Sequence, residues 1–485
     1  MPTNTIGIID LGSNSSRLVI YEYTEHESYR PVFEMKRSLQ LAQSMTETNA
    51  ITDEGIKRAV ACTKLFLRTG RLYNVTTWRP VATAAVRQAS NQSDVLSTIY
   101  EETGIHFQVL TGEEEAYYGF LGAVNTLDVT DALIFDIGGA SSELMYMHNR
   151  ELVHAVSIPH GSLSLTKRFL NESQSNIGTK VKKFMKQQFD QISWLKELNC
   201  ETLIGLGGTA RASAKLDLQR NGEKAQGGLH GYEIDALSVK NHLSALKEMP
   251  LADIEKIKGL SKHRANIITA GVASISALTD ISCAKSILIS RNGIREGLFF
   301  EHYLQQYTPP VVPSVLHSSL ENFSRIFRVN RSAADTVATS TLWLFDKLQA
   351  VHGLADSDRK LIWVTANIES CGTYVNTEKW TKHSAYLVLS SNLYGLTYSE
   401  LVDISSLLEN KGPIRLKKMY VLIRMAKLLT LQVGVNMDEL QLYIDGGKAV
   451  NISHQSSLRE QVYISADENI ESDFKKIFGV KLVLN

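Results

Sequence analysis

Two short loops rich in glycine and serine carry the residues whose types and spacing best suit phosphate chemistry. The first is DLGSNSSR, from Asp10 to Arg17, and the second is DIGGASSE, from Asp136 to Glu143. Small side chains let several backbone N–H groups point to one place and bind phosphate oxygens. An aspartate at the start of such a loop can hold Mg²⁺ directly or through its waters. Tight hairpins use the same residues for shape alone, so a single loop of this kind is a weak signal.

The two loops belong to an internal repeat. Residues 6–21, IGIIDLGSNSSRLVIY, align with residues 132–147, ALIFDIGGASSELMYM, at a constant offset. Each copy is an apolar strand ending in aspartate, a loop of small residues and a second strand, a pattern that predicts a β-hairpin. The repeat therefore predicts a duplicated half with one phosphate loop in each copy. The copies differ in charge at one position, because Arg17 aligns with Glu143.

Alternating strands and helices must position these loops, and that pattern occupies the first part of the chain. Thr52 is expected to cap a helix that ends near Gly70. The following segments are predicted to be strands: Thr5–Asp10, Arg17–Tyr23, Val81–Ala84, Phe107–Leu110, Ala132–Asp136, Glu143–His148, Thr202–Gly205 and Ser286–Ser290.

A proline cluster marks the end of this α/β part. Pro309, Pro310 and Pro313 remove backbone donors that a helix or a central strand needs. Beyond them the apolar periodicity is mostly helical until residue 440, and short alternating segments at 440–452 and 478–484 predict a small α/β piece.

Composition narrows the function classes. The 485 residues are too many for one compact core, and 51 basic residues balance 51 acidic ones, so nucleic acid and anionic membrane are not expected partners. The four cysteines are far apart with no CxxC pair, which is typical of reduced thiols rather than bridges or a zinc site. The sequence starts with no basic and apolar leader and has no stretch of about 18 apolar residues, so a cytoplasmic location is expected.

The loops also carry a family resemblance. Together with GLGGTARASAK at 205–215, they resemble the phosphate motifs of the actin, Hsp70 and sugar-kinase superfold. The chain is further similar to the Ppx/GppA family of exopolyphosphatases and guanosine pentaphosphate phosphohydrolases. The motifs that carry this similarity are ATAAVRQASN at 82–91, TGEEEA at 111–116, GLSKHRANIITAG at 259–271, SRNGIREGLF at 290–299 and KHSAYLVLSSNLYGLT at 382–397.

The resemblance implies a fold with four parts. Two duplicated actin-like (ribonuclease H-like) α/β domains are expected at 1–125 and 126–305, followed by a mostly helical HD-like domain at 306–437 and a small C-terminal α/β appendage at 438–485.

The resemblance also assigns site residues. Glu115 matches the family's catalytic glutamate, a general base for the attacking water, whereas Glu113 and Glu114 are explained by the dipole of the helix they begin. Glu143 matches a second carboxylate that orients water or metal, and it would hold Mg²⁺ with Asp10 and Asp136. The expected phosphate-binding residues are Gly12, Ser13, Asn14, Ser15, Arg17, Arg87, Gly138, Gly139, Ala140, Ser141, Gly207, Gly208 and Thr209. Two of these predictions have simpler alternatives: Arg87 could pair with a surface acid, and Gly207 with Gly208 could only form a tight turn.

No chemistry of its own is expected in the helical domain. Ala366 and Asn367 stand where the family pattern tends to have a histidine followed by an acid, the residues that would bind metal, and a lone His383 is more often a packed residue. The segment 411–437 has six basic residues and no acidic one. It could hold the tail of a long polyphosphate or simply be a solvated helix face. The speculative tail contacts are Arg415, Lys417, Lys418 and Arg424.

These observations predict an Mg²⁺-dependent exopolyphosphatase that acts on the end of inorganic polyphosphate. A guanosine pentaphosphate 5′-phosphohydrolase is the close alternative, since both reactions use the same apparatus. An actin-fold ATP-dependent kinase or a non-catalytic alarmone sensor fits less well. Guanine nucleotide alarmones are candidate partners, and a homodimer is compatible with the resemblance.

Overall fold

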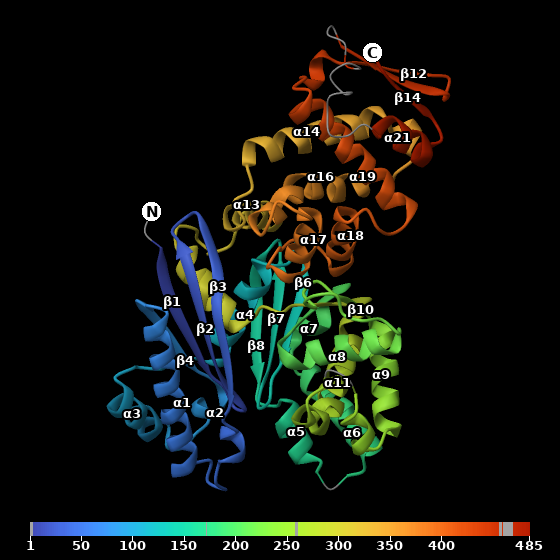
Figure 1. Cartoon of the computed structure of the whole chain (residues 1–485). Coiled ribbons are helices and arrows are strands. Elements are labelled where there is room, and N and C mark those ends of the chain that lie inside the picture. Colours follow the sequence, from blue (N-terminus) through green and yellow to red (C-terminus); the bar gives the residue numbers. More distant parts are fainter. Residues whose placement is uncertain (1–2, 171, 258–259, 455–457, 459–468) are drawn as a thin grey trace. The chain divides into compact units, whose positions relative to one another are not determined.

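The chain forms two compact units. Unit 1 comprises Met1–Ser318 together with Tyr394–Tyr398, and unit 2 comprises Ser319–Leu393 and Ser399–Asn485. The computed structural model describes all residues except 1–2, 171, 258–259, 455–457 and 459–468 (Figure 1).

Unit 1 contains two sheets that share a five-strand topology, and the second sheet has one additional edge strand, β10. The first has the strand order β3-β2-β1-β4-β5, and the second has the order β10-β11-β9-β6-β7-β8. In each sheet three consecutive strands, β1-β2-β3 or β6-β7-β8, form an antiparallel meander. The first strand of the meander pairs with a parallel strand, β1 with β4 and β6 with β9, and a further parallel strand follows in each sheet. The duplicated half predicted from the repeat is therefore confirmed. The strands are β1 (Asn4–Leu11), β2 (Ser15–Thr24), β3 (Ser28–Ser38), β4 (Thr77–Ala82), β5 (Gln108–Val109), β6 (Ala132–Ile137), β7 (Ser142–His148), β8 (Glu151–Ile158), β9 (Thr202–Leu206), β10 (Glu233–Asp235) and β11 (Ser286–Ile289).

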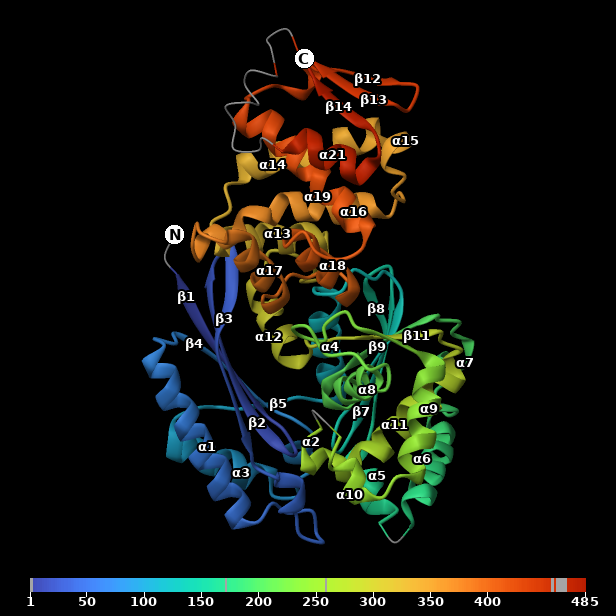
Figure 2. The same ribbon diagram turned by 45° about the vertical axis from the view of Figure 1, so that its right-hand side comes forward.

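Three apolar cores hold unit 1 together. One lies between the first sheet and helices α1 (Asp53–Leu72) and α3 (Gln92–Thr103). A second lies between the second sheet and a layer of helices. The third joins the two sheets through α4 (Gly112–Val124) and α12 (Ile294–Tyr303), as Figure 2 shows. The helices against the second sheet are α5 (Ser162–Arg168), α6 (Gln174–Phe189), α7 (Ser193–Glu197), α8 (Gly207–Arg220), α9 (Ala236–Glu248), α10 (Leu251–Ile254) and α11 (Lys262–Ser282).

Helix α1 begins as predicted. The side chain of Thr52 accepts a hydrogen bond from the backbone N–H of Gly55 at 3.3 Å. The helix continues to Leu72, two residues beyond the Gly70 that was expected to end it. One described helix, over Arg264–Ser282, is long and apolar enough to cross a membrane, but 83% of that window is buried inside the protein.

A short segment far along the chain completes unit 1. The backbone N–H of Tyr398 donates to the carbonyl of Gly231 at 2.9 Å, and the Tyr398 hydroxyl accepts from the backbone N–H of Gln226 at 2.7 Å. The ring of Tyr394 lies 5.2 Å from that of His230, centroid to centroid. These contacts explain why Tyr394–Tyr398 belongs to unit 1.

Unit 2 is helical with a small sheet at its C-terminal end. In this sheet β12 (Gln441–Asp445) pairs antiparallel with β13 (Ala449–Ser453), and β13 pairs parallel with β14 (Lys481–Leu484). The helices that lie in or enter unit 2 are α13 (Val315–Ile326), α14 (Arg331–Lys347), α15 (Gln349–His352), α16 (Asp358–Ile368), the 3₁₀ helix η2 (Glu369–Tyr374), α17 (Trp380–Ser390), α18 (Tyr398–Leu408), α19 (Ile414–Lys427) and α21 (Ile470–Phe478).

Candidate active site

The two glycine- and serine-rich loops open into one cavity of about 210 Å³ in unit 1. Most of the sequence-predicted site residues line it. These are Asp10, Gly12, Ser13, Asn14, Ser15, Arg17, Glu115, Asp136, Gly138, Gly139, Ala140, Ser141, Glu143, Gly207 and Gly208. Arg87 and Thr209 are not among the lining residues.

The hairpins place equivalent residues at equivalent points. Asp10 lies opposite Arg17 in the β1–β2 ladder, and Asp136 lies opposite Glu143 in the β6–β7 ladder. The first glycine of each loop lies close to the backbone across the turn, as the sequence argument allows. A Cβ atom on Gly12 would lie 3.0 Å from the backbone carbonyl oxygen of Ser15, and one on Gly138 would lie 3.1 Å from that of Ser141.

The loops can supply donors to an anion. The backbone carbonyls of Ser13 and Asn14 accept hydrogen bonds from residues 39–42. Among the described residues, nothing accepts from the backbone N–H groups of Ser13 or Asn14, nor from those of Gly139 or Ala140. Such adjacent N–H groups at a cavity wall form an anion-binding concavity.

Helix α8 begins at the same cavity and adds the first N–H groups of a helix, which have no partner within the helix. Gly207 has a φ of +71°, and a Cβ atom there would collide with the Asp136 carboxylate. At Gly208 a Cβ atom would collide with the Arg264 guanidinium. The Thr209 side chain points into the fold, where its hydroxyl donates to the carbonyl of Ile137 at 2.8 Å.

The three glutamates of TGEEEA have different surroundings. Thr111 and Glu114 cap helix α4 reciprocally: Glu114 N–H donates to the Thr111 hydroxyl at 3.1 Å, and Thr111 N–H donates to the Glu114 carboxylate at 2.7 Å. Glu113 is exposed. Glu115 is only 5% exposed and reaches the cavity.

Arg87 contacts the Glu115 carboxylate and donates to the carbonyl of Leu110 at 2.7 Å. It therefore lies behind Glu115 rather than at the cavity wall, although it was expected to bind phosphate directly. Burial raises the pKa of Glu115 above its ordinary value, against the opposing charge of Arg87. A carboxylate with a raised pKa is a better proton acceptor near neutral pH.

Four further carboxylates line the cavity, those of Asp10, Asp136, Glu143 and Glu296. Burial raises the pKa of Asp10, and it raises the pKa of Asp136 to about 6. Burial, and then the negative charges of Glu115 and Asp136, raise the pKa of Glu143, which accepts a hydrogen bond from Ser157 Oγ at 2.9 Å. A cation bound in the cavity would neutralise these carboxylates when they are ionised.

This donor set fits magnesium better than a metal held by protein ligands alone. Among the described residues, no three His, Cys, Asp or Glu side chains are close enough to hold one metal ion. Asp10, Asp136 and Glu143 therefore do not form a closed cage. Mg²⁺ commonly keeps several waters and binds one or two carboxylates together with substrate phosphates, and the carboxylates of this cavity offer that arrangement.

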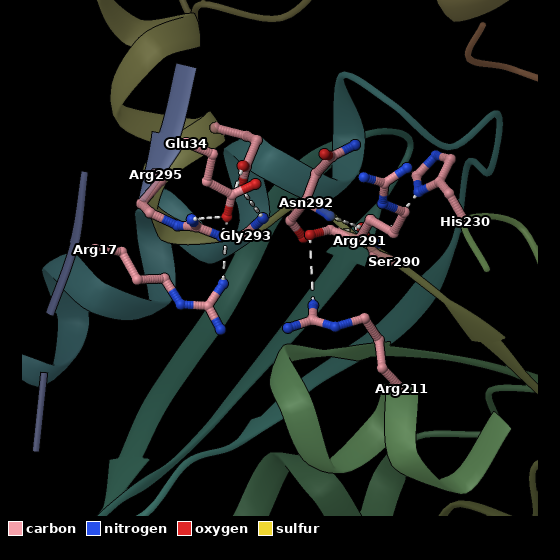
Figure 3. Close-up of polar contacts among 10 residues, drawn as sticks. Arg17, Glu34, Arg211, His230, Ser290, Arg291, Asn292, Gly293 and Arg295 are labelled. Carbon is pink, nitrogen blue, oxygen red and sulfur yellow. Dashed lines mark hydrogen bonds and ion pairs between the residues drawn. The ribbon is translucent and has the colours of Figure 1, made fainter. Parts of the chain in front are cut away.

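Arginines that sequence reasoning did not single out also line the cavity. They are Arg211, Arg291 and Arg295. Glu34 lies between Arg295, at 2.9 Å, and Arg17, at 3.7 Å, as Figure 3 shows. Burial, and then the charges of Arg17 and Arg295, lower the pKa of Arg211 to about 10. The SRNGIREGLF and GLGGTARASAK motifs contain these residues, but an arginine alone does not indicate whether it faces a cavity or solvent.

The segment Ser290–Gly293 is held from behind by a buried histidine. The backbone N–H of Arg291 donates to His230 Nδ1 at 3.3 Å (Figure 3). His230 Nε2 lies 2.9 Å from the carbonyl of Thr126. These two contacts define a neutral imidazole with its proton on Nε2. Burial lowers the pKa of His230 to about 4, so it stays neutral at physiological pH.

Comparisons with known proteins agree with this geometry. A sequence model of the Ppx/GppA phosphatase family matches residues 19–306. The chain belongs to the Ppx/GppA phosphatase family. Members of this family hydrolyse phosphoanhydride bonds, and this chain is an enzyme of that class. Residues 315–433 match the model of Ppx/GppA phosphatase domain III.

Solved structures share the fold of unit 1. A Ppx/GppA family member from Aquifex aeolicus is 24% identical, with 63% of this chain and 99% of that chain covered and a TM-score of 0.56. An exopolyphosphatase from Cytophaga hutchinsonii is also 24% identical, with 62% of this chain and 98% of that chain covered and a TM-score of 0.56.

The basic run falls within the matched domain III of this Ppx/GppA phosphatase. Arg415 binds Asp358 at 2.6 Å and Asp403 at 2.7 Å. Lys418 donates to the carbonyl of His352 at 2.5 Å, and Arg424 pairs with Asp473 at 2.7 Å. Three of the four expected tail contacts thus have partners inside unit 2, and the charge that they offer to a polyanion is smaller than the sequence suggests. Whether they bind a polyphosphate tail stays a prediction.

Proposed function

We propose that this chain is an exopolyphosphatase that removes the terminal phosphate of inorganic polyphosphate with Mg²⁺ bound in the unit 1 cavity. One observation carries the proposal: the two glycine- and serine-rich loops, a helix N-terminus and four arginines line the cavity that also holds the buried Glu115. Glu34 partly neutralises Arg17 and Arg295, but together with Arg211 and Arg291 they still offer more cations than a single phosphate needs. A chain of phosphates has enough negative charge to occupy them all.

The reaction needs a base, an anion cradle and a stabilised leaving group. The terminal phosphate would lie on the N–H groups of the two loops and of helix α8. Glu115 would accept a proton from water as the water oxygen bonds to phosphorus and the bond to the bridging oxygen breaks. The shortened chain would leave with the bridging oxygen, whose charge the arginines would stabilise. Arg87 would keep the Glu115 carboxylate in position.

Asp10, Asp136 and Glu143 are the residues that would hold Mg²⁺, one or two of them as direct ligands and the others through its waters. When bound, the ion would neutralise charge on the phosphate oxygens. Glu143 would orient the water, since the Ser157 hydroxyl fixes one of its oxygens at 2.9 Å.

A side-by-side phosphate-release assay tests the proposal. Long polyphosphate, guanosine pentaphosphate and ATP would be offered at equal concentrations with Mg²⁺. We expect the highest kcat/KM with polyphosphate. A clearly higher kcat/KM with guanosine pentaphosphate would identify that nucleotide, rather than polyphosphate, as the substrate. Phosphate transfer from ATP without polyphosphate hydrolysis would indicate a kinase.

A further inference from the structure

Unit 2 contains a cavity of its own, with a volume of about 420 Å³. This volume lies within the range of about 300 to 1,000 Å³ that is common for small-molecule sites. Helices α16, α17, α18 and α19 and the turn η2 surround it. Its lining residues are Thr365, Glu369, Trp380, Thr381, Leu407, Leu408, Tyr420, Ile423, Arg424 and Lys427.

One wall of the cavity combines aromatic rings with cations. Lys427 Nζ lies 4.5 Å from the ring centroid of Trp380, and the Arg424 guanidinium carbon lies 5.6 Å from that of Tyr420. Tyr420, Arg424 and Lys427 are spaced so that they share one face of helix α19. Both cations belong to the basic run of the sequence, so part of that run faces an enclosed space.

The cavity also holds one poorly exposed acid. The Glu369 side chain is 13% exposed, and its Oε1 lies 2.6 Å from Lys427 Nζ. Within the part of the chain that the structure describes, no other side chain pairs with this carboxylate, so it retains capacity to accept hydrogen bonds. The partner of Arg424, Asp473, is 39% exposed and so lies at a solvated position.

This lining suits a flat, acidic molecule. Leu407, Leu408 and Ile423 provide apolar surface, and the aromatic rings favour a planar body. Arg424 and Lys427 favour a phosphate, which arginine can bind with two donors. Glu369 favours ring N–H donors. A metal is a poor fit, because no three metal-ligating side chains are grouped anywhere among the described residues.

We propose that the unit 2 cavity binds a nucleoside monophosphate, with the base between the aromatic rings and the apolar surface and the phosphate on Arg424 and Lys427. The N–H edge of the base would donate to Glu369. The proposal does not depend on the substrate of unit 1.

Calorimetry with the full-length protein tests the proposal. GMP, AMP, guanosine and inorganic phosphate would each be titrated without added metal. We expect GMP or AMP to bind more tightly than guanosine or phosphate alone and to quench tryptophan fluorescence through Trp380. Loss of a charge-assisted contact in Lys427→Gln should weaken nucleotide binding by about 10- to 100-fold. Lys427→Arg keeps the charge and should restore most of the affinity.

Two controls separate this site from the unit 1 cavity. Lys382→Gln changes an exposed lysine on the same helix as Trp380 and should bind like the parent. Arg17→Gln, in unit 1, should also leave nucleotide binding unchanged. The proposal is wrong if neither nucleotide binds, or if inorganic phosphate binds as tightly as the nucleotides. It is also wrong if nucleotide binding is lost in Arg17→Gln but kept in Lys427→Gln. Equal melting temperatures of Lys427→Gln and the parent would exclude unfolding as the cause of weaker binding.

Discussion

Arg17 and Glu143 occupy the same position in the two duplicated hairpins, each directly opposite an aspartate on the neighbouring strand. The scaffold is therefore repeated while its charge is reversed. The first hairpin presents a cation to the cavity and the second presents a carboxylate. A phosphate and the water or metal that acts on it could thus be held by the same local architecture on opposite sides of one site.

The general base gives the first prediction. Glu115→Gln keeps the size of the side chain but removes its capacity to accept a proton, so kcat should fall by about 10²- to 10⁴-fold while substrate binding persists. Glu113→Gln is the matched control, because Glu113 is exposed on the same helical turn. A rate of phosphate release by Glu115→Gln within about threefold of the parent would show that Glu115 is not the base and only interacts with the dipole at the start of the helix.

Asp136 supplies a prediction about the metal. Asp136→Asn should increase the Mg²⁺ concentration needed for half-maximal activity, because an amide oxygen is a weaker ligand than a carboxylate. Activity would be titrated against Mg²⁺ and the melting temperature measured in parallel. An unchanged Mg²⁺ midpoint with a lowered melting temperature would show that Asp136 is structural.

The buried carboxylates predict how stability depends on pH without metal. The pKa of Glu143 is raised in the folded protein, so its bound proton favours folding below the ordinary value of 4.5, and this stabilisation is lost as the pH rises through the folded value. Glu143→Gln cannot ionise. In EDTA it should therefore melt at a higher temperature than the parent at about pH 8.5 but not at about pH 4. A variant that melts below the parent at the higher pH would contradict this explanation.

His230 should act as a positioning residue for the Ser290–Gly293 segment. His230→Phe keeps a ring but removes both hydrogen bonds, so Arg291 should be less well placed and the KM for polyphosphate should rise by about 3- to 10-fold. His230→Gln, which keeps a donor and an acceptor, should recover part of the loss. If both variants lose kcat and stability equally with an unchanged KM, His230 has only a structural role.

The hypothesis that the basic residues of unit 2 bind the tail of a long polyphosphate predicts the effect of removing their charges. Replacing Arg415, Lys417, Lys418 and Arg424 with Gln should weaken the binding of long polyphosphate and flatten its salt dependence, with little effect on short chains. Because the other three cations have partners inside unit 2, Lys417→Gln alone should produce most of the change. Equal affinities of the parent and the quadruple variant across a salt series would favour a solvated helix face.

The sequence could predict the features that are repeated or strongly periodic. The hairpins at Asp10 and Asp136 follow from the repeat, and Thr52 caps its helix through a local signal. The edge strands β3 and β8 were missed because their exposed and half-buried side chains do not alternate regularly, and β10 was missed because it has only three residues.

Other features of the site depend on packing between distant segments. Arg295 reaches Glu34 across 261 positions of sequence, and no local pattern indicates such a pair. Arg87 was expected at the phosphate but lies behind Glu115, because its position depends on how helix α4 packs. Gly208 is expected in a phosphate loop, yet its lack of a Cβ also makes room for Arg264.

The segment Tyr394–Tyr398 has a consequence for how the protein is made. A ribosome synthesises the chain from its N-terminus at about 5 to 20 residues per second. It must finish the Ser319–Leu393 part of unit 2 before it adds the last residues of unit 1. Until Tyr398 emerges, the backbone carbonyl of Gly231 lacks its hydrogen bond and the rings of His230 and Tyr232 lack their aromatic neighbours. A chain that ends at Ser318 would therefore leave these contacts of unit 1 unmade.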